Sequence, residues 1–316
     1  MSSTFDLSNP NRTIHVGVVV LNSTTEILDV APIDIISSLS IAEDFEIPKG
    51  MDVPAEVFPP EARAQRMDIE FHWVSEAGPS QLMKFTSGIR MQPTDSFETC
   101  PPLDIVLLGA HKMNDQPTEA ELAFVRKSYN DCSAFLTICG GVMVPLAAGL
   151  LEGKKATGPR FFLKVLRQMS PNTEWLEKRY VQDGKLWTSS TLLNGTDMMF
   201  AFAKSVWGKR GEKEGAPNIV EMTGKLGAWP ARDIDFKDVP ILANTMAAGD
   251  ESRKGLRSLK RFITTHDDTG KPTSIETMSE DVPFQTLPGN FDFALCYATE
   301  KFPATLSDQQ DVDTYK

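Results

Sequence analysis

The sequence lacks the features of secreted, membrane-spanning and nucleic-acid-binding proteins. Its 316 residues include only four cysteines and no CxxC pair, whereas small secreted scaffolds carry dense cysteine frameworks. No apolar run reaches the roughly 18 residues of a membrane span. The opening stretch MSSTFDLSNPNRT lacks the basic and apolar regions of a signal peptide. The net charge of −11 disfavours binding to phosphate backbones. We therefore expect a cytoplasmic protein with free thiols that contacts neither membrane nor nucleic acid.

Strand-like and helix-like segments alternate between residues 14 and 208. Continuous apolar runs, typical of strands buried on both faces, occur at 14–21, 104–110 and 133–138. A strand with one buried and one wetter face is predicted at 67–75, and a hairpin is predicted to turn at Asp183-Gly184. Helices are predicted at 118–129, 142–153, 161–169 and 194–208. This alternation indicates an α/β fold with a mostly parallel sheet.

The rest of the chain has weaker patterns. Residues 43–65 are polar and rich in proline, which indicates a surface insertion in a domain that spans 1–210. Beyond Gly208 the only compact apolar segment after residue 241 is FDFALCYA. We expect 211–316 to be a C-terminal extension that is partly ordered or disordered.

Cys139 occupies the most informative position in the sequence. It follows the apolar segment 133–138 and precedes Gly140, Gly141 and a predicted helix, which resembles the logic of a G-x-S-x-G nucleophile elbow. A thiol at a helix N-terminus is expected to have a pKa below that of a free thiol. The Gly140 N–H is then a candidate oxyanion donor. The alternative is that Cys139 is a small hydrophobic residue buried at a tight corner.

Further candidates come from the expected carboxyl ends of the strands, where open α/β sheets bind ligands. Asp29 is the acid/base candidate, because a partly desolvated carboxyl group beside a thiolate has a raised pKa; alternatively, it caps a helix. Glu26 is a weaker rival that we expect to be exposed. The Ala110 N–H is a second candidate oxyanion donor, since Gly109 allows its loop to approach closely.

The remaining candidates are polar residues of less specific context. His111 either faces the cleft or lies in a surface loop, and Ser190 ends the segment 186–190. His15 and His72 lie on predicted strands and look structural. Because no His, Cys or Asp cluster has metal-ligand spacing along the chain, we expect neither a metal nor another cofactor.

Four segments of the sequence resemble the ThiJ/PfpI superfamily, which has the class I glutamine amidotransferase-like fold. They are LDVAP at 28–32, DIVLLGA at 104–110, TICGGVMVPLAAGLLEGKKAT at 137–157 and DGKLWTSS at 183–190. Within the superfamily the chain looks closest to the isocyanide hydratase-like branch and its fungal relatives. The resemblance implies a flavodoxin-like three-layer sandwich with a cysteine nucleophile elbow, a homodimer, Cys139 as the nucleophile and Asp29 as its carboxyl partner.

Three kinds of function are compatible with these residues. The first is a hydratase or lyase in which the Cys139 thiolate adds to a small isocyanide-like or aldehyde-like substrate. The second is a redox-sensing or stress-response protein with an oxidisable Cys139 and no turnover. The third is a ligand-binding protein that kept the fold without the chemistry. Peptidase and glutamine amidotransferase activities are not expected, because Gly140 stands where such relatives carry a histidine.

Overall fold

The computed structural model describes residues 5–41, 59–210 and 217–238, together with four short strands closer to the C-terminus. The chain divides into two compact units, residues 1–238 and 239–316. In the second unit, β13 (Thr264–His266) pairs antiparallel with β14 (Pro272–Ser274), and β15 (Gln285–Leu287) with β16 (Phe291–Phe293). No helix of the described residues is long and apolar enough to cross a membrane.

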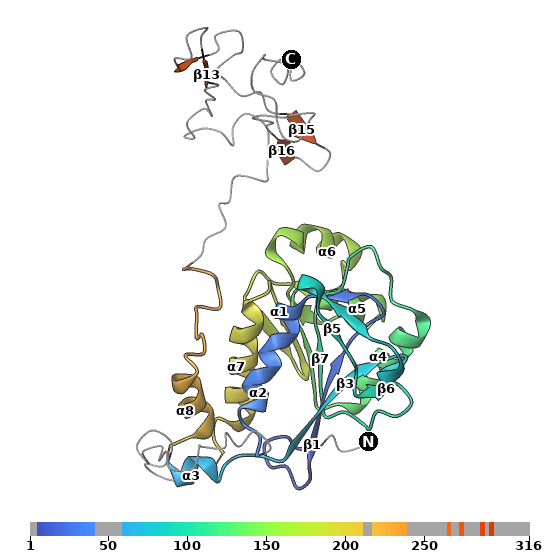
Figure 1. The fold of residues 1–316 in the computed structure, drawn as a ribbon. Helices are drawn as coiled ribbons and strands as arrows, with labels where there is room; N and C mark the ends of the chain where they lie inside the picture. Colours follow the sequence, from blue (N-terminus) through green and yellow to red (C-terminus); the bar gives the residue numbers. More distant parts are fainter. Residues whose placement is uncertain are drawn as a thin grey trace. The chain divides into compact units, whose positions relative to one another are not determined.

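A seven-stranded sheet runs through the first unit in the order β11-β12-β8-β7-β1-β3-β6 (Figure 1). Its strands are β1 (Ile14–Val19), β3 (Ile69–Ser75), β6 (Asp95–Ser96), β7 (Ile105–Leu108), β8 (Ala134–Thr137), β11 (Tyr180–Asp183) and β12 (Leu186–Ser189). All neighbouring strands are parallel except β11 and β12, which form a hairpin. The expected mostly parallel sheet is confirmed.

The first unit also contains two smaller sheets. β2 (Thr24–Thr25) pairs with β4 (Met83–Phe85), which also pairs with β5 (Arg90–Met91). β9 (Lys155–Ala156) pairs in parallel with β10 (Glu174–Trp175).

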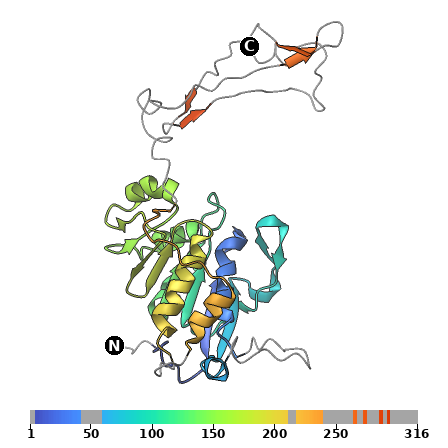
Figure 2. The same ribbon diagram turned by 90° about the vertical axis from the view of Figure 1, so that its left-hand side faces the viewer.

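Helices cover both faces of the main sheet, and each layer has its own hydrophobic cluster. One cluster includes residues of α2 (Asp34–Ser37), α7 (Asn194–Trp207) and α8 (Ile219–Leu226). The other includes residues of α4 (Glu119–Asp131), α5 (Met143–Ala147) and α6 (Leu163–Met169). Figure 2 shows α7, α8 and the segment from α1 (Ile27–Val30) to α2 together on one face. The fold is the expected three-layer α/β sandwich.

Two helices show how local sequence sets helix length. α4 begins with a capping box, in which the Thr118 side chain accepts from the Glu121 N–H and the Glu121 carboxylate accepts from the Thr118 N–H. The helix expected at 142–153 is shorter, because Gly149 adopts φ 75°. The Gly149 and Leu150 N–H groups donate to Leu146 and Pro145, which is the hydrogen-bond pattern of a Schellman motif.

The strand predicted to have one buried and one wetter face shows this division only in part, because Glu70 is exposed but His72 on the same face is not. In β3 the His72 side chain is buried, while Phe71 and Trp73 are only half-buried. Hydrophobic alternation therefore gave the wrong exposure for His72, because its ring contacts His15 on β1 and Asp95 on β6, which the pattern of one strand cannot show.

The unit boundary lies after Asp238, whereas the sequence indicated a boundary at 210. The segment that follows α8 is bound to α7 and to the residue before β11 by ion pairs. Arg232 contacts the buried Asp197 at 2.5 Å, and the buried Arg179 contacts Asp238 at 2.5 Å. The sequence did not indicate this attachment, because the partners of each ion pair are far apart along the chain.

The residues of the predicted insertion divide into two groups. Residues 43–58 lie outside the described residues. α3 (Pro60–Arg63) buries Ala62, and the Gln65 amide donates to the carbonyl of Pro217. The last part of the predicted insertion therefore packs into the first unit.

The two hydrophobic clusters predict that two phenylalanines contribute very differently to the free energy of unfolding. Phe202 is 1% exposed in α7, whereas Phe161 is 65% exposed. We expect Phe202→Ala to lower the free energy of unfolding by about 3–5 kcal/mol through lost burial and a cavity. The matched variant Phe161→Ala should change it by less than about 0.5 kcal/mol. Urea unfolding measures both, and equal losses would contradict this assignment of the core.

Candidate active site

Cys139 is the first residue of the 3-10 helix Cys139–Val142, which follows β8 after a sharp turn. Its φ of 56° is in the left-handed region, which is unusual for a residue other than glycine. A Cβ on Gly141 would lie only 2.4 Å from the carbonyl oxygen of Leu108, so this close turn requires glycine there. Strained backbone of this kind is concentrated at functional sites. The geometry is that of the elbow expected from the sequence.

Asp29 is the buried carboxyl group at this edge of the sheet. It lies in α1 (Ile27–Val30) and is 0% exposed. The Ala110 N–H donates to Asp29 Oδ2 at 2.9 Å, while Oδ1 has no hydrogen-bond partner among the described residues. A Cβ on Gly109 would lie 3.0 Å from the Cβ of Asp29, so the glycine permits the close approach. Asp29 therefore keeps one oxygen available for proton exchange.

The pKa of Asp29 is raised from 3.8 to about 7. Burial is the largest cause, and the neighbouring Glu26 carboxylate adds to it. The Ala110 N–H opposes this rise in pKa by donating to the carboxylate, and the Cys139 thiol lowers the pKa to a smaller extent. A carboxyl group with this pKa can accept or donate a proton near neutral pH.

The pKa of Cys139 is raised to about 11, and the expected lowering is wrong. Burial is the main cause, and the Asp29 carboxylate is the next. The N–H groups of Leu192 and Gly140 act in the opposite direction by donating to the sulfur. The 3-10 turn and the five-residue α5 provide too short a helix to outweigh burial and a neighbouring negative charge.

Two contributors to the site were missed or misplaced by sequence reasoning. Glu26 is half-buried rather than exposed, and its Oε1 accepts from the Thr86 hydroxyl at 3.0 Å. Its charge raises the pKa of both Asp29 and Cys139. Leu192 contributes only its backbone N–H, from a loop position with φ 23°. No side-chain pattern could identify such a donor.

Two predicted binding residues are engaged elsewhere. The Ala110 N–H points to Asp29, so in this structure it positions the carboxyl group instead of serving as an oxyanion donor. The Ser190 hydroxyl is buried and donates to the carbonyl of Gly158 at 3.0 Å. The acceptors of these two hydrogen bonds, the Asp29 carboxylate and the Gly158 carbonyl, come from distant parts of the chain.

His111 and Gly140 lie together at a pocket of about 110 Å³. Its other lining residues are Met113, Asp115, Gln116, Pro117, Met143, Leu146, Ala147 and Met169. Burial lowers the pKa of His111, and its Nδ1 has no hydrogen-bond partner among the described residues. The pocket is therefore mainly apolar, with a neutral imidazole at its wall. Cys139 is half-buried next to the lining residue Gly140.

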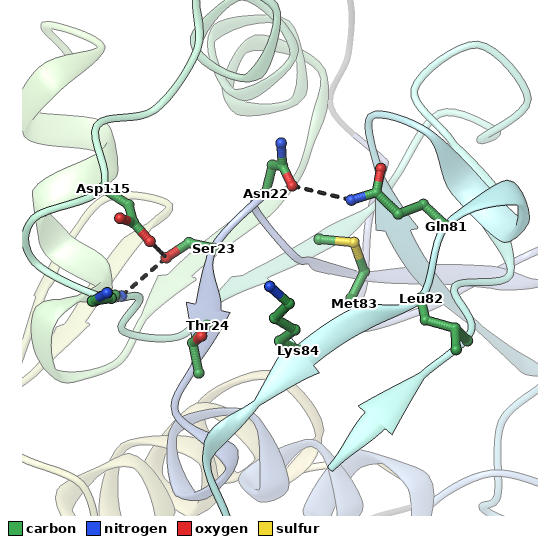
Figure 3. Close-up of a pocket in the computed structure, with 9 residues that line it drawn as sticks. Asn22, Ser23, Thr24, Gln81, Leu82, Met83, Lys84 and Asp115 are labelled. Carbon is green, nitrogen blue, oxygen red and sulfur yellow. Dashed lines mark hydrogen bonds between the residues drawn. The ribbon is translucent and has the colours of Figure 1, made fainter. Parts of the chain in front are cut away.

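A second pocket of about 170 Å³ lies between the loop after β1 and the β4 strand. Figure 3 shows the Ser23 hydroxyl hydrogen-bonded to Asp115 and the Gln81 amide hydrogen-bonded to Asn22. These bonds join three loops beside Thr24, whose carbonyl accepts from the Lys112 N–H. The pocket is polar and does not include the elbow residues.

These features define a class of α/β sandwich with a cysteine on a strand-to-helix elbow and a buried carboxyl group beside it. The DJ-1/PfpI family model matches residues 49–206, and the chain belongs to this family. It is 30% identical over 154 residues to isonitrile hydratase of Pseudomonas putida, a match that covers 48% of this chain and 65% of that protein. It is 35% identical over 68 residues to the oryzines biosynthesis cluster protein J of Aspergillus oryzae, covering 22% and 38% of the two chains.

Solved structures support the fold. A THiJ/PfpI family protein from Pseudomonas syringae has a TM-score of 0.51 at 16% identity, covering 72% of this chain and 80% of that one. Drosophila melanogaster DJ-1beta has a TM-score of 0.50 at 15% identity, covering 69% of this chain and 100% of that one.

The raised pKa values predict an unusual response of Cys139 to loss of its neighbour. Asp29→Asn removes a negative charge that raises the pKa of the thiol. We expect faster alkylation of Cys139 by iodoacetamide at pH 8, since each unit of lower pKa gives about tenfold more thiolate well below the pKa. Peptide mass mapping follows the rate, with Cys100 as the internal control. Slower alkylation of Cys139 would contradict the geometry.

Proposed function

We propose that this protein is a cysteine-dependent hydratase of the lyase type that acts on a small electrophile, and that the electrophile is an isocyanide. The observation that carries the proposal is the buried Asp29 with a pKa of about 7 next to the Cys139 thiol. A thiol whose own pKa is about 11 is a weak nucleophile at neutral pH and needs an adjacent base. Asp29 supplies that base.

The proposed reaction begins with transfer of the thiol proton from Cys139 to Asp29. The sulfur then bonds to the terminal carbon of the isocyanide, and Asp29 returns the proton to that carbon, which gives a thioimidate. Water adds to the same carbon, and collapse of the adduct breaks the C–S bond. The products are an N-substituted formamide and the free thiol. The net reaction is therefore the addition of one water molecule to the isocyanide to give the formamide.

The backbone groups around the sulfur have a defined part in this scheme. The N–H groups of Gly140 and Leu192 donate to the Cys139 sulfur, which stabilises the thiolate as it forms and as it leaves. Ala110 and Gly109 position Asp29. The pocket at His111 and Gly140 is proposed to hold the apolar substituent of the substrate.

The similarity to isonitrile hydratase supports the isocyanide as the substrate class, although the alignment covers 65% of that protein. A small aldehyde would add to the thiol in the same way, so it belongs in the same substrate screen. We expect a homodimer, as is common for small soluble enzymes.

A redox-sensing role for Cys139 is disfavoured by the same electrostatics. Peroxide reacts with thiolates, and sensor cysteines have low pKa values and good access to solvent. Cys139 is half-buried with a raised pKa. Its burial next to an acid suits a reaction in which the proton leaves only when substrate is bound.

Turnover should depend on both residues of the pair. We expect Cys139→Ser to abolish isocyanide hydration and Asp29→Asn to lower kcat/KM by about 10²–10⁴-fold. The wild-type kcat/KM should rise as the pH rises through about 7, because Asp29 accepts a proton only when ionised. That limb should be absent in the residual activity of Asp29→Asn. Formamide release measured by chromatography provides the rates.

The matched control is Cys100→Ser, because the Cys100 thiol donates to the neighbouring Pro101 carbonyl and lies outside the elbow. It should keep full activity. Undiminished turnover in Cys139→Ser would refute the nucleophile, and an unchanged pH profile in Asp29→Asn would refute the base. Turnover of aldehydes but not isocyanides would overturn the substrate class alone.

A further inference from the structure

A cluster of two histidines and a glutamate lies on β1 and β3, away from the elbow. In the parallel register, His15 pairs with Glu70 and Gly17 pairs with His72. Alternate residues of a strand share a face, so His15, Glu70 and His72 lie on the same face of the sheet (strands labelled in Figure 1). His15 is the second residue of β1, whereas Cys139 follows the carboxyl end of β8. The cluster is therefore at the opposite end of the parallel strands.

The three potential ligand atoms lie close together. His15 Nδ1 is 3.0 Å from His72 Nε2 and 3.5 Å from Glu70 Oε2, and His72 Nε2 is 4.0 Å from the same oxygen. A tetrahedral Zn²⁺ ion with bonds of about 2.0–2.1 Å requires ligand atoms about 3.3 Å apart. The three separations differ from this value by about 0.2–0.7 Å, so movements of the side chains by less than about 1 Å would complete that triangle.

The orientation of His72 suits a metal ligand. Its Nδ1 lies 3.0 Å from Asp95 Oδ2, and the Thr94 hydroxyl donates to the same oxygen at 2.7 Å. A carboxylate acceptor places the His72 proton on Nδ1 and leaves the Nε2 lone pair facing His15 and Glu70. Metal-bound histidines usually have this type of carboxylate partner, which sets the tautomer and raises the basicity of the ligand.

Exposure gives an ion access to the cluster. The His72 side chain is 7% exposed, that of His15 is 23% exposed and that of Glu70 is 60% exposed. The buried imidazole is therefore held in place, while the carboxylate at the rim can move onto an entering ion. A proton on His15 Nδ1 can shift to its other ring nitrogen, so two neutral imidazoles and one carboxylate are available as ligands.

We propose that His15, Glu70 and His72 bind one divalent transition-metal ion, with Zn²⁺ as the best fit, and that water completes its coordination. Three nitrogen and oxygen ligands with an open position are typical of zinc. The ion would join β1 to β3 at the amino end of the sheet, and Asp95 on β6 would act as a positioning residue through His72. This revises the expectation that the chain binds no metal.

Binding of metal to tag-free, chelator-treated full-length protein tests this proposal. Isothermal titration with Zn²⁺ should give one ion per chain, and Zn²⁺ should raise the Tm, because a ligand that binds only the folded state stabilises it. Co²⁺ in place of Zn²⁺ should give visible bands without a thiolate charge-transfer band, which excludes the cysteines as ligands. Repeating the titration in Cys139→Ala controls for binding at the elbow.

Substitutions of the more exposed residues of the cluster test whether these side chains, and not others, bind the metal. Glu70→Gln and His15→Gln should each weaken binding by at least about a hundredfold, and Asp95→Asn by about 10–100-fold. Glu98→Gln, an exposed carboxylate on the same unit, is the matched control and should bind like the wild type. The wild-type protein and all variants should melt alike without metal.

Two results would overturn the proposal. Absence of Zn²⁺ and Co²⁺ binding by the wild-type protein would leave the cluster as a hydrogen-bonded histidine pair. Binding that Glu70→Gln and His15→Gln leave unchanged, or that produces a thiolate band, would place the metal elsewhere. Neither result depends on isocyanide turnover, so the metal site and the proposed activity fail separately.

Discussion

The hydrogen bond from the Ala110 N–H to the buried Asp29 carboxylate is the interaction on which the elbow chemistry depends. It joins the short helix after β1 to the loop after β7, and it orients one carboxylate oxygen while the other is left without a partner among the described residues. Gly109 permits the approach because a Cβ there would contact Asp29 at 3.0 Å. Burial without full compensation raises the pKa of Asp29 to about 7. A proton can then pass in either direction near neutral pH.

The same burial explains why the sequence predicts the location of the site better than its electrostatics. The apolar runs, the glycines after Cys139 and the strand-to-helix order were sufficient to predict that Cys139 lies at a strand-to-helix turn. The sign of the Cys139 pKa shift was wrong, because α5 is short and Asp29 and Glu26 are negative. The hydrogen bonds of Ala110 and Ser190 could not be predicted for a related reason. Their acceptors, Asp29 and Gly158, come from distant parts of the chain that only the tertiary fold brings close.

Strand register explains why the histidine cluster could not be predicted from the sequence. His15 and His72 are 57 residues apart in the chain, so no spacing rule connects them, yet parallel pairing brings their rings within hydrogen-bonding distance. Residues at the carboxyl ends of the strands thus form the elbow site, and residues at the amino end of β1 and β3 form the histidine cluster. The fold separates a site suited to proton transfer from one suited to binding a cation. All the residues named here in the two sites belong to the first unit.

Direct titration of the Asp29 carboxyl group tests the central claim most sharply. Carbon NMR of protein labelled at aspartate carboxyl carbons, with Asp29→Asn to assign the signal, follows its ionisation without the need for a substrate. We predict a midpoint of about 7 that rises when Cys139 is replaced by alanine, since the thiol lowers the pKa of the carboxyl group. A midpoint near the ordinary value of 3.8 would contradict it, because Asp29 could then neither hold nor return a proton at neutral pH.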